Sequence, residues 1–129
     1  MTKKTARVEQ LLELANQLRS PGGCPWDQKQ TLKDMSGFVQ KEAVELDEAI
    51  DEQDSAHICE ELGDVLFNLC LIASIAEEQG QFTLAEVVAK TTAKIKTRHT
   101  WVFGEDKVNS SEEAIALWKL NKQRERGQK

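Results

Sequence analysis

The sequence has little that would build a β-protein, a membrane protein or a nucleic-acid-binding protein. Aromatic residues make up 5% of its 129 residues, Tyr is absent and Pro occurs twice. No stretch alternates apolar and polar residues as a strand does, and no apolar run approaches the roughly 18 residues of a membrane-spanning helix. The formal net charge of -5 argues against a general nucleic-acid binder. We therefore expect an all-α protein with no membrane and no nucleic acid among its partners.

Cysteine is also scarce. Cys24, Cys59 and Cys70 are an odd number without close pairing, and their spacing to the histidines matches no zinc motif. The first seven residues lack the apolar core of a signal peptide. These features predict free thiols and a cytoplasmic location.

Apolar residues recur at helical spacing along most of the chain, which predicts a helical bundle of about four to five helices. We find no internal repeat and no linker, so we expect one domain over residues 1–129, with a core of about residues 8–123 and frayed ends. The helices are predicted over about residues 4–19, 32–53 and 54–79, with two more opening at the capping boxes Thr83-x-x-Glu86 and Ser110-x-x-Glu113.

The third of these segments is the most apolar, which predicts that it lies at the centre of the bundle. Phe67, Leu71 and Ile75 lie off its main apolar stripe. Such a broad apolar face is typical of a helix with a second interface, and it predicts a homodimer.

Residues 24–31 and 99–104 lack helical periodicity and are predicted to be loops. Trp26 in the first of these loops has two interpretations. Its ring could cover the core, or it could offer a flat surface on which a base or sugar stacks. Periodicity does not decide between them.

Two acidic motifs, Glu42-x-x-Glu45 and Glu61-x-x-Asp64, each place two carboxylates on one face of a predicted helix. On a helical projection Glu42 falls near the middle of its apolar stripe and Glu45 at the edge. Glu61 falls inside the stripe of the next helix, flanked by Asp64 and Asn68. Acidic side chains on a core face need a partner, so the two motifs predict one shared site.

Two other interpretations of these carboxylates stay open. They could be ordinary surface charges of an acidic protein, or part of a buried ion network with Lys94 or Arg98. If the carboxylates bind a metal, a set of Asp and Glu without His selects a hard cation, Mg²⁺ or Mn²⁺. Lys94, Arg98 and Lys122 would suit the phosphates of a small-molecule substrate, which a metal-activated water would hydrolyse.

The ordered set of motifs resembles the MazG-type nucleoside triphosphate pyrophosphohydrolases over about residues 8–123. Either acidic motif alone is a weak signal, but the ordered set of motifs is highly specific. The motifs are Gly23-Cys24-Pro25-Trp26-Asp27-x-x-Gln30-Thr31, Glu42-x-x-Glu45, Glu61-x-x-Asp64, Lys94-x-x-x-Arg98-His99, Val102-Phe103-Gly104 and Trp118-x-x-x-Lys122.

This resemblance implies a MazG-like all-α fold and Mg²⁺-dependent hydrolysis of an NTP or dNTP to the monophosphate and pyrophosphate, by water attacking the α-phosphorus. It further implies a role in nucleotide-pool cleaning, and a homodimer or tetramer with sites near the subunit interface. The implied metal ligands are Glu42, Glu45, Glu61 and Asp64, with Glu42 as the catalytic base. The implied substrate-binding residues are Lys94, Arg98, Trp118 and Lys122, to which the residue patterns above add Trp26 and Asn68.

The chain departs from the family pattern at two positions. Lys41 stands where the family usually has a glutamate, and Thr100 stands where it usually has a proline. Two alternatives to the broad activity stay open. One is a non-catalytic helical dimer that senses nucleotides or binds a protein; the other is a related phosphohydrolase with a narrower substrate such as dUTP, dCTP or a phosphoribosyl-ATP.

Overall fold

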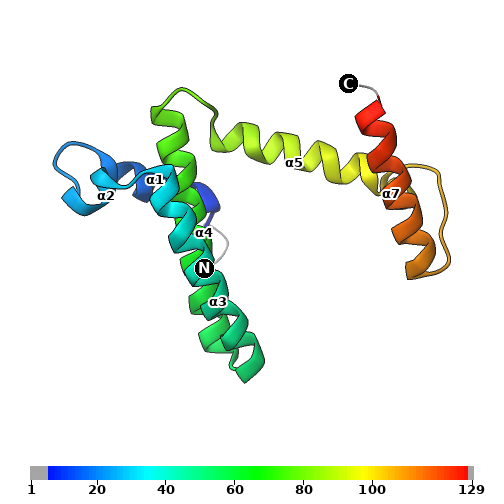
Figure 1. Ribbon diagram of the computed structural model, residues 1–129, viewed down its shortest axis with the longest axis horizontal. Helices are drawn as coiled ribbons and strands as arrows, with labels where there is room; N and C mark the ends of the chain where they lie inside the picture. The colour runs from blue at the N-terminus through cyan, green and yellow to red at the C-terminus, as the bar shows by residue number, and fades with distance from the viewer. Residues whose placement is uncertain (1–5, 128–129) are drawn as a thin grey trace. The chain divides into compact units, whose positions relative to one another are not determined.

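The computed structural model of the protein describes residues 6–127, and this part of the chain contains α-helices and no β-strand (Figure 1). The predicted all-α fold class is confirmed. None of these helices combines the length and the apolar character that crossing a membrane requires. The helices are α1 (Val8–Arg19), α2 (Pro25–Lys29), α3 (Leu32–Glu52), α4 (Ser55–Glu78), α5 (Leu84–Arg98), α6 (Thr100–Phe103) and α7 (Ser111–Gly127).

The chain forms two compact units, residues 1–84 and 85–129. Helices α1 to α4 belong to the first unit, whereas α6, α7 and nearly all of α5 belong to the second. The acidic motifs therefore lie in the first unit and the predicted phosphate-binding cations in the second. That residues 1–129 act as one domain stays a prediction.

Side-chain caps define where two of the long helices begin; the sequence predicted the cap at Ser110, whereas the cap at Thr31 is a finding of the structure. Thr31 Oγ1 accepts a hydrogen bond from the Asp34 amide at 3.1 Å, and Asp34 Oδ2 accepts one from the Thr31 amide at 3.0 Å. At the start of α7, Ser110 Oγ accepts a hydrogen bond from the Glu113 amide at 3.1 Å. These bonds satisfy amides that a helix N-terminus would otherwise leave unpaired.

One predicted helix start and two predicted loops were wrong. Helix α1 begins at Val8 rather than near residue 4; residues 6 and 7 are not helical, and residues 1–5 lie outside the described chain. The two predicted loops each contain a short helix, α2 and α6. Helices of five and four residues are too short to show a helical repeat, although Pro25 at the first position of α2 is typical of a helix start.

The core of the first unit lies where α1 and α3 pack on α4. Ala15 of α1, Met35 of α3, and Leu71 and Ile75 of α4 form its buried centre. The prediction that α4 is the central helix of the bundle is confirmed for this unit. The partly buried residues around this centre are Leu32, Phe38, Phe67 and Ile72.

The assignment of Phe67, Leu71 and Ile75 to a subunit interface was wrong. Leu71 and Ile75 are 3% and 1% exposed, and Phe67 packs against the same cluster. Leu71 and Ile75 are covered within the first unit, and Phe67 is partly covered, because α4 is contacted by both α1 and α3. A homodimer must therefore use residues other than Leu71 and Ile75.

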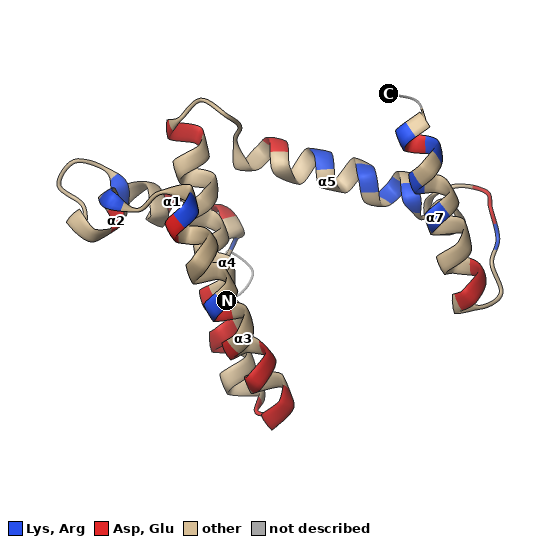
Figure 2. Cartoon of the chain, viewed as in Figure 1, with Lys and Arg blue, Asp and Glu red and all other residues tan. Residues whose placement is uncertain are grey.

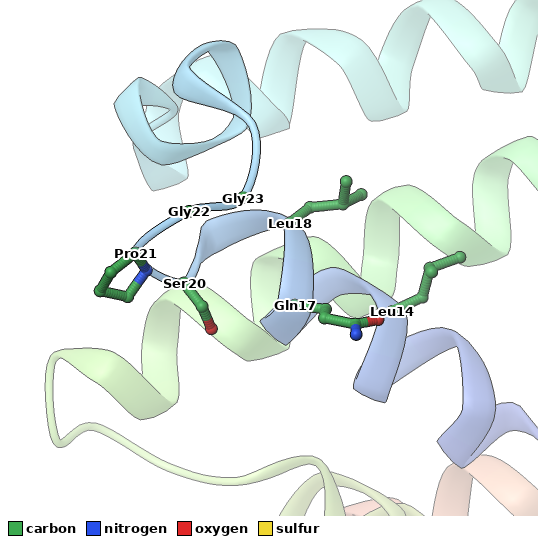
Figure 3. A pocket seen from close by; sticks show the side chains of 7 residues that line it. All are labelled: Leu14, Gln17, Leu18, Ser20, Pro21, Gly22 and Gly23. Carbon is green, nitrogen blue, oxygen red and sulfur yellow. The ribbon is translucent and has the colours of Figure 1, made fainter.

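A tight turn connects α1 to α2. The Cys24 amide donates to the Leu18 carbonyl at 2.7 Å, and a Cβ at Gly23 would collide with the carbonyl oxygens of Gln17 and Leu18. A surface pocket of about 430 Å³ lies beside this turn, and Figure 3 shows its lining side chains. None of the predicted site residues lines it.

Arg19, at the end of α1, ties α2 and α4 together. Its side chain is 8% exposed and forms an ion pair with Glu78 at 2.7 Å. Its guanidinium also donates to the carbonyl oxygens of Asp27 and Gln30, the latter at 3.1 Å. These bonds hold the short helix that carries Trp26 against α1.

The second unit is held largely by polar contacts. Asn121 of α7 is 4% exposed and donates to the Arg98 carbonyl at 3.2 Å and to Thr100 Oγ1 at 3.0 Å. Arg98 pairs with Glu125 at 3.2 Å. Within its described residues this unit buries no apolar side chain fully.

Candidate metal site and nucleotide-binding residues

Three of the four predicted metal ligands meet between α3 and α4. Glu42 and Glu45 project from α3 and Glu61 from α4, and one carboxylate oxygen of each lies within 4.8 Å of the others. The two helices come together because only Gln53 and Asp54 separate them. Gln53 adopts a left-handed conformation with φ 59°, which reverses the chain. The tight turn thus aligns the two acidic motifs.

Two oxygens in this cluster are buried and have no hydrogen-bond partner among the described residues. They are Glu42 Oε2 and Glu61 Oε2. A buried carboxylate oxygen without a partner destabilises the fold. A hard divalent cation bound by carboxylate oxygens would satisfy both atoms, so the donor set fits Mg²⁺ or Mn²⁺.

The electrostatics of the cluster favour a positive partner. Burial, followed by hydrogen bonding to Glu45 and the negative charges of Glu45, Asp64 and Glu61, raises the pKa of Glu42 from 4.5 to about 7. Three ionised carboxylates at this distance repel one another, so the site holds a proton near neutral pH unless a cation replaces it.

The other two predicted residues of α4 lie beside this cluster rather than in it. Asp64 is exposed and contributes no oxygen to the group of three, although its charge acts on Glu42. Asn68 is half-buried, one helical turn further along α4. Whether Asp64 is a metal ligand stays a prediction.

The sequence interpretation missed His57 as a neighbour of the cluster. Its Nδ1 lies 3.1 Å from Glu52 Oε1 and its Nε2 lies 3.4 Å from Glu61 Oε1. The hydrogen bond to Glu52 raises the pKa of His57 above its usual value. The spacing of four residues between His57 and Glu61 on one helix could have indicated the second contact.

Trp26 both packs on the fold and faces solvent. Its ring centroid lies 5.5 Å from that of Phe38 of α3, with the rings tilted by 54°. The residue nevertheless stays 53% exposed. One part of the ring is therefore available for stacking, while the contact with Phe38 holds it in place.

In the second unit, two of the predicted substrate-binding cations lie against the ring of a third predicted residue, Trp118. The Arg98 guanidinium lies 5.4 Å, and the Lys122 ammonium 5.2 Å, from the centroid of Trp118. Lys94 is exposed one turn before Arg98 on α5, where Figure 2 shows several basic residues. An aromatic face with two cations suits a phosphorylated ligand with a planar group.

The rings near Trp118 also line a small apolar pocket. It has a volume of about 210 Å³ and includes His99, Trp101 and Ile115. The rings of His99 and Trp101 lie 5.0 Å apart. The alternative of an ion network has little support, because Arg98 pairs with Glu125 and Glu61 with His57 among the described ion pairs.

Comparison with known proteins gives consistent results. A family model described as the MazG nucleotide pyrophosphohydrolase domain matches residues 30–103, a range that contains both acidic motifs. The chain is 40% identical to the nucleoside triphosphate pyrophosphohydrolase/pyrophosphatase MazG of Thermotoga maritima, over 94% of this chain and 46% of that protein. It is 35% identical to the nucleoside triphosphate pyrophosphohydrolase of Escherichia coli, over 95% and 47%.

A relative of uncharacterised function, YabN of Bacillus subtilis, is 42% identical over 88% of this chain and 23% of that protein. The chain thus spans about a quarter to a half of the length of these relatives. Among solved structures, the crystal structure of a mazG-related protein from Thermotoga maritima matches with a TM-score of 0.75 and 35% identity. That match covers 89% of this chain and 98% of the other.

Proposed function

The chain belongs to the MazG nucleotide pyrophosphohydrolase family, and on that premise we propose that it hydrolyses nucleoside triphosphates, NTP or dNTP, to the monophosphate and pyrophosphate. The observation that carries this proposal is the cluster of Glu42, Glu45 and Glu61 with its two buried, unpartnered oxygens. Such a cluster favours a bound cation, and a cation next to phosphates is the usual basis of phosphoryl chemistry in proteins.

The cluster would hold Mg²⁺, with Mn²⁺ as an alternative, through Glu42, Glu45 and Glu61, and Asp64 would complete the set. A bound divalent ion neutralises phosphate charge and lowers the pKa of a water molecule. We assign Glu42 the role of accepting the proton from the water that attacks the α-phosphorus. Its half-buried position beside the other carboxylates supports that choice, because it places the Glu42 carboxylate next to the proposed metal and its water.

The predicted substrate-binding residues of the second unit would contact the phosphates and the nucleotide. Lys94 and Arg98 would hold phosphate oxygens, and Trp118 and Lys122 would contact the nucleotide. Arg98 can bind a phosphate by releasing Glu125, with which it forms an ion pair in this structure. In the first unit, the exposed part of Trp26 and the half-buried Asn68 would contact the base or sugar.

We further propose a homodimer or tetramer that works in the cytoplasm on the nucleotide pool. Helix α5 buries no residue within the chain, and its Val87, Val88 and Ile95 are 40 to 55% exposed. Leu62 and Leu69 of α4 are about half exposed as well, at 53% and 46%. Apolar surface of this extent on a helix is typical of a subunit contact.

The first test is to incubate the purified protein with a panel of NTPs and dNTPs, with Mg²⁺ or with EDTA, and to separate the products by ion-exchange chromatography. We expect monophosphate and pyrophosphate in equal amounts, only with metal. Diphosphate and orthophosphate would contradict attack at the α-phosphorus. No turnover of any nucleotide by a folded, metal-loaded sample would favour a binding module, and turnover of one nucleotide alone would favour a narrow-substrate enzyme.

A further inference from the structure

His57 occupies a defined position in the first turn of α4. Asp54 caps this helix, and its Oδ1 accepts hydrogen bonds from the amides of Ala56 and His57 at 3.1 and 3.3 Å. Gln53, in its left-handed conformation, ends α3 immediately before. The backbone of His57 is therefore held by the same turn that brings the two acidic motifs together.

The imidazole of His57 lies between two carboxylates from different helices. Its Nδ1 faces Glu52 of α3 at 3.1 Å, which sets the orientation of the ring. Its Nε2 faces Oε1 of Glu61 at 3.4 Å. A ring held at one edge by a carboxylate and pointing its other edge at a metal-binding group is a common way to orient such a group.

The two oxygens of Glu61 consequently differ in their surroundings. Oε1 faces the imidazole, whereas Oε2 is buried and has no hydrogen-bond partner among the described residues. The Glu61 side chain is only 13% exposed, so water does not substitute freely for the contact of Oε1 with His57. Glu61 also belongs to the group of three carboxylates that approach within 4.8 Å.

We propose that His57 is a positioning residue for Glu61, which it holds by Oε1 so that Oε2 is left for the cation. This inference rests on the proposed metal site. It assigns His57 no contact with substrate or metal. Glu52 acts one step further away, by orienting the imidazole.

A merely structural role for His57 and a positioning role differ in what its loss changes. Loss of a structural contact lowers thermal stability, whereas loss of a positioning contact weakens metal binding. The His57 side chain is 35% exposed and that of Glu52 is 61% exposed, and ion pairs this exposed stabilise proteins little. Loss of the pair should leave thermal stability nearly unchanged. Loss of a positioning contact should instead weaken metal binding, by about 10- to 100-fold in the usual case.

The experiment measures Mn²⁺ binding by the full chain without nucleotide, from the EPR signal of free Mn²⁺. We expect His57→Leu to bind Mn²⁺ about 10- to 100-fold more weakly than the wild type at an unchanged melting temperature. His57→Gln should recover most of the affinity, because its amide N–H lies close to the position of the imidazole Nε2. His99→Leu, the same substitution of the other histidine, is the matched control and should bind like the wild type.

A second pair of variants tests the outer contact. Glu52→Gln should weaken Mn²⁺ binding less than His57→Leu does, since Glu52 acts only through the ring. Asp51→Asn removes a neighbouring exposed charge and is its control. Equal Mn²⁺ affinity of His57→Leu and the wild type would overturn the inference alone. Absence of Mn²⁺ binding by the wild type would overturn the metal site and the inference together.

Discussion

The helices α3 and α4 have two ends of opposite character. At the end that packs on α1, Met35, Leu71 and Ile75 are buried at 1 to 3% exposure. At the end near the Gln53–Asp54 turn, the half-buried side chains include the carboxylates of Glu42, Glu45 and Glu61, although Ala49 is fully buried there as well. All the buried residues of α4 lie between Cys70 and Ala76, in its C-terminal half.

The contrast separates stability from chemistry along the same two helices. The apolar end removes hydrocarbon from water and needs nothing else. The acidic end brings like charges together and leaves buried oxygens unpaired, so by itself it destabilises the fold. A natural protein retains such a group where function requires it, and the stable end compensates for the cost.

The largest expected effect is on activity, from a change at the acidic end. Glu42→Gln keeps the shape of the side chain but removes its charge and its ability to accept a proton. We expect kcat to fall about 100- to 10,000-fold while the circular dichroism spectrum stays that of the wild type. Glu48→Gln, at an exposed position of the same helix, is the control. Retained turnover in Glu42→Gln would remove Glu42 from the catalytic role.

The next largest effect is on stability, from a change at the apolar end. Ile75 is 1% exposed, so Ile75→Ala should lower the free energy of unfolding by about 2–5 kcal/mol. Ile50→Ala, near the turn at the other end, truncates a side chain that is 51% exposed and should cost less than about 1 kcal/mol. Urea titration measures both. Equal losses would show that the two ends do not differ in packing as described.

The smallest effect is the pH dependence of stability without metal. Because folding raises the pKa of Glu42 from 4.5 to about 7, the folded protein binds more protons than the unfolded chain in that window. Its contribution to stability is therefore lost as pH rises from about 4.5 through 7. In EDTA, Glu42→Gln should be less sensitive to pH than the wild type between pH 5 and 8.

At pH 8, Mg²⁺ should raise the melting temperature of the wild type, because ligand binding to the folded state stabilises it. It should raise that of Glu42→Gln less. The pKa of His57 is also raised, but His57 is present in both proteins. A difference between their pH profiles therefore reports on Glu42. Parallel pH profiles for the two proteins in EDTA would contradict the assigned pKa of Glu42.

Local sequence patterns were sufficient for several parts of the structure. The cap at Ser110 and the helix that it opens are determined by neighbouring residues, and the structure has both. The cap at Thr31 is equally local but was not predicted. The short helices α2 and α6 were missed, because one turn of helix contains too few residues for a repeat. The contact of Lys122 with Trp118 follows from their spacing of four residues on one helix. The contact of Arg98 with the same ring does not, because Arg98 comes from α5.

The sequence by itself determined the helical fold class and placed Glu42 and Glu61 on apolar helix faces, because helical periodicity defines each side chain's angle about its own axis. Only the tertiary structure decided what each face meets. It placed Leu71 and Ile75 in the core with α1 instead of at a subunit contact, and it placed Glu52 of α3 against His57 of α4. The physical reason is that the neighbours of a helix depend on turns and on packing between distant segments, which no local repeat encodes.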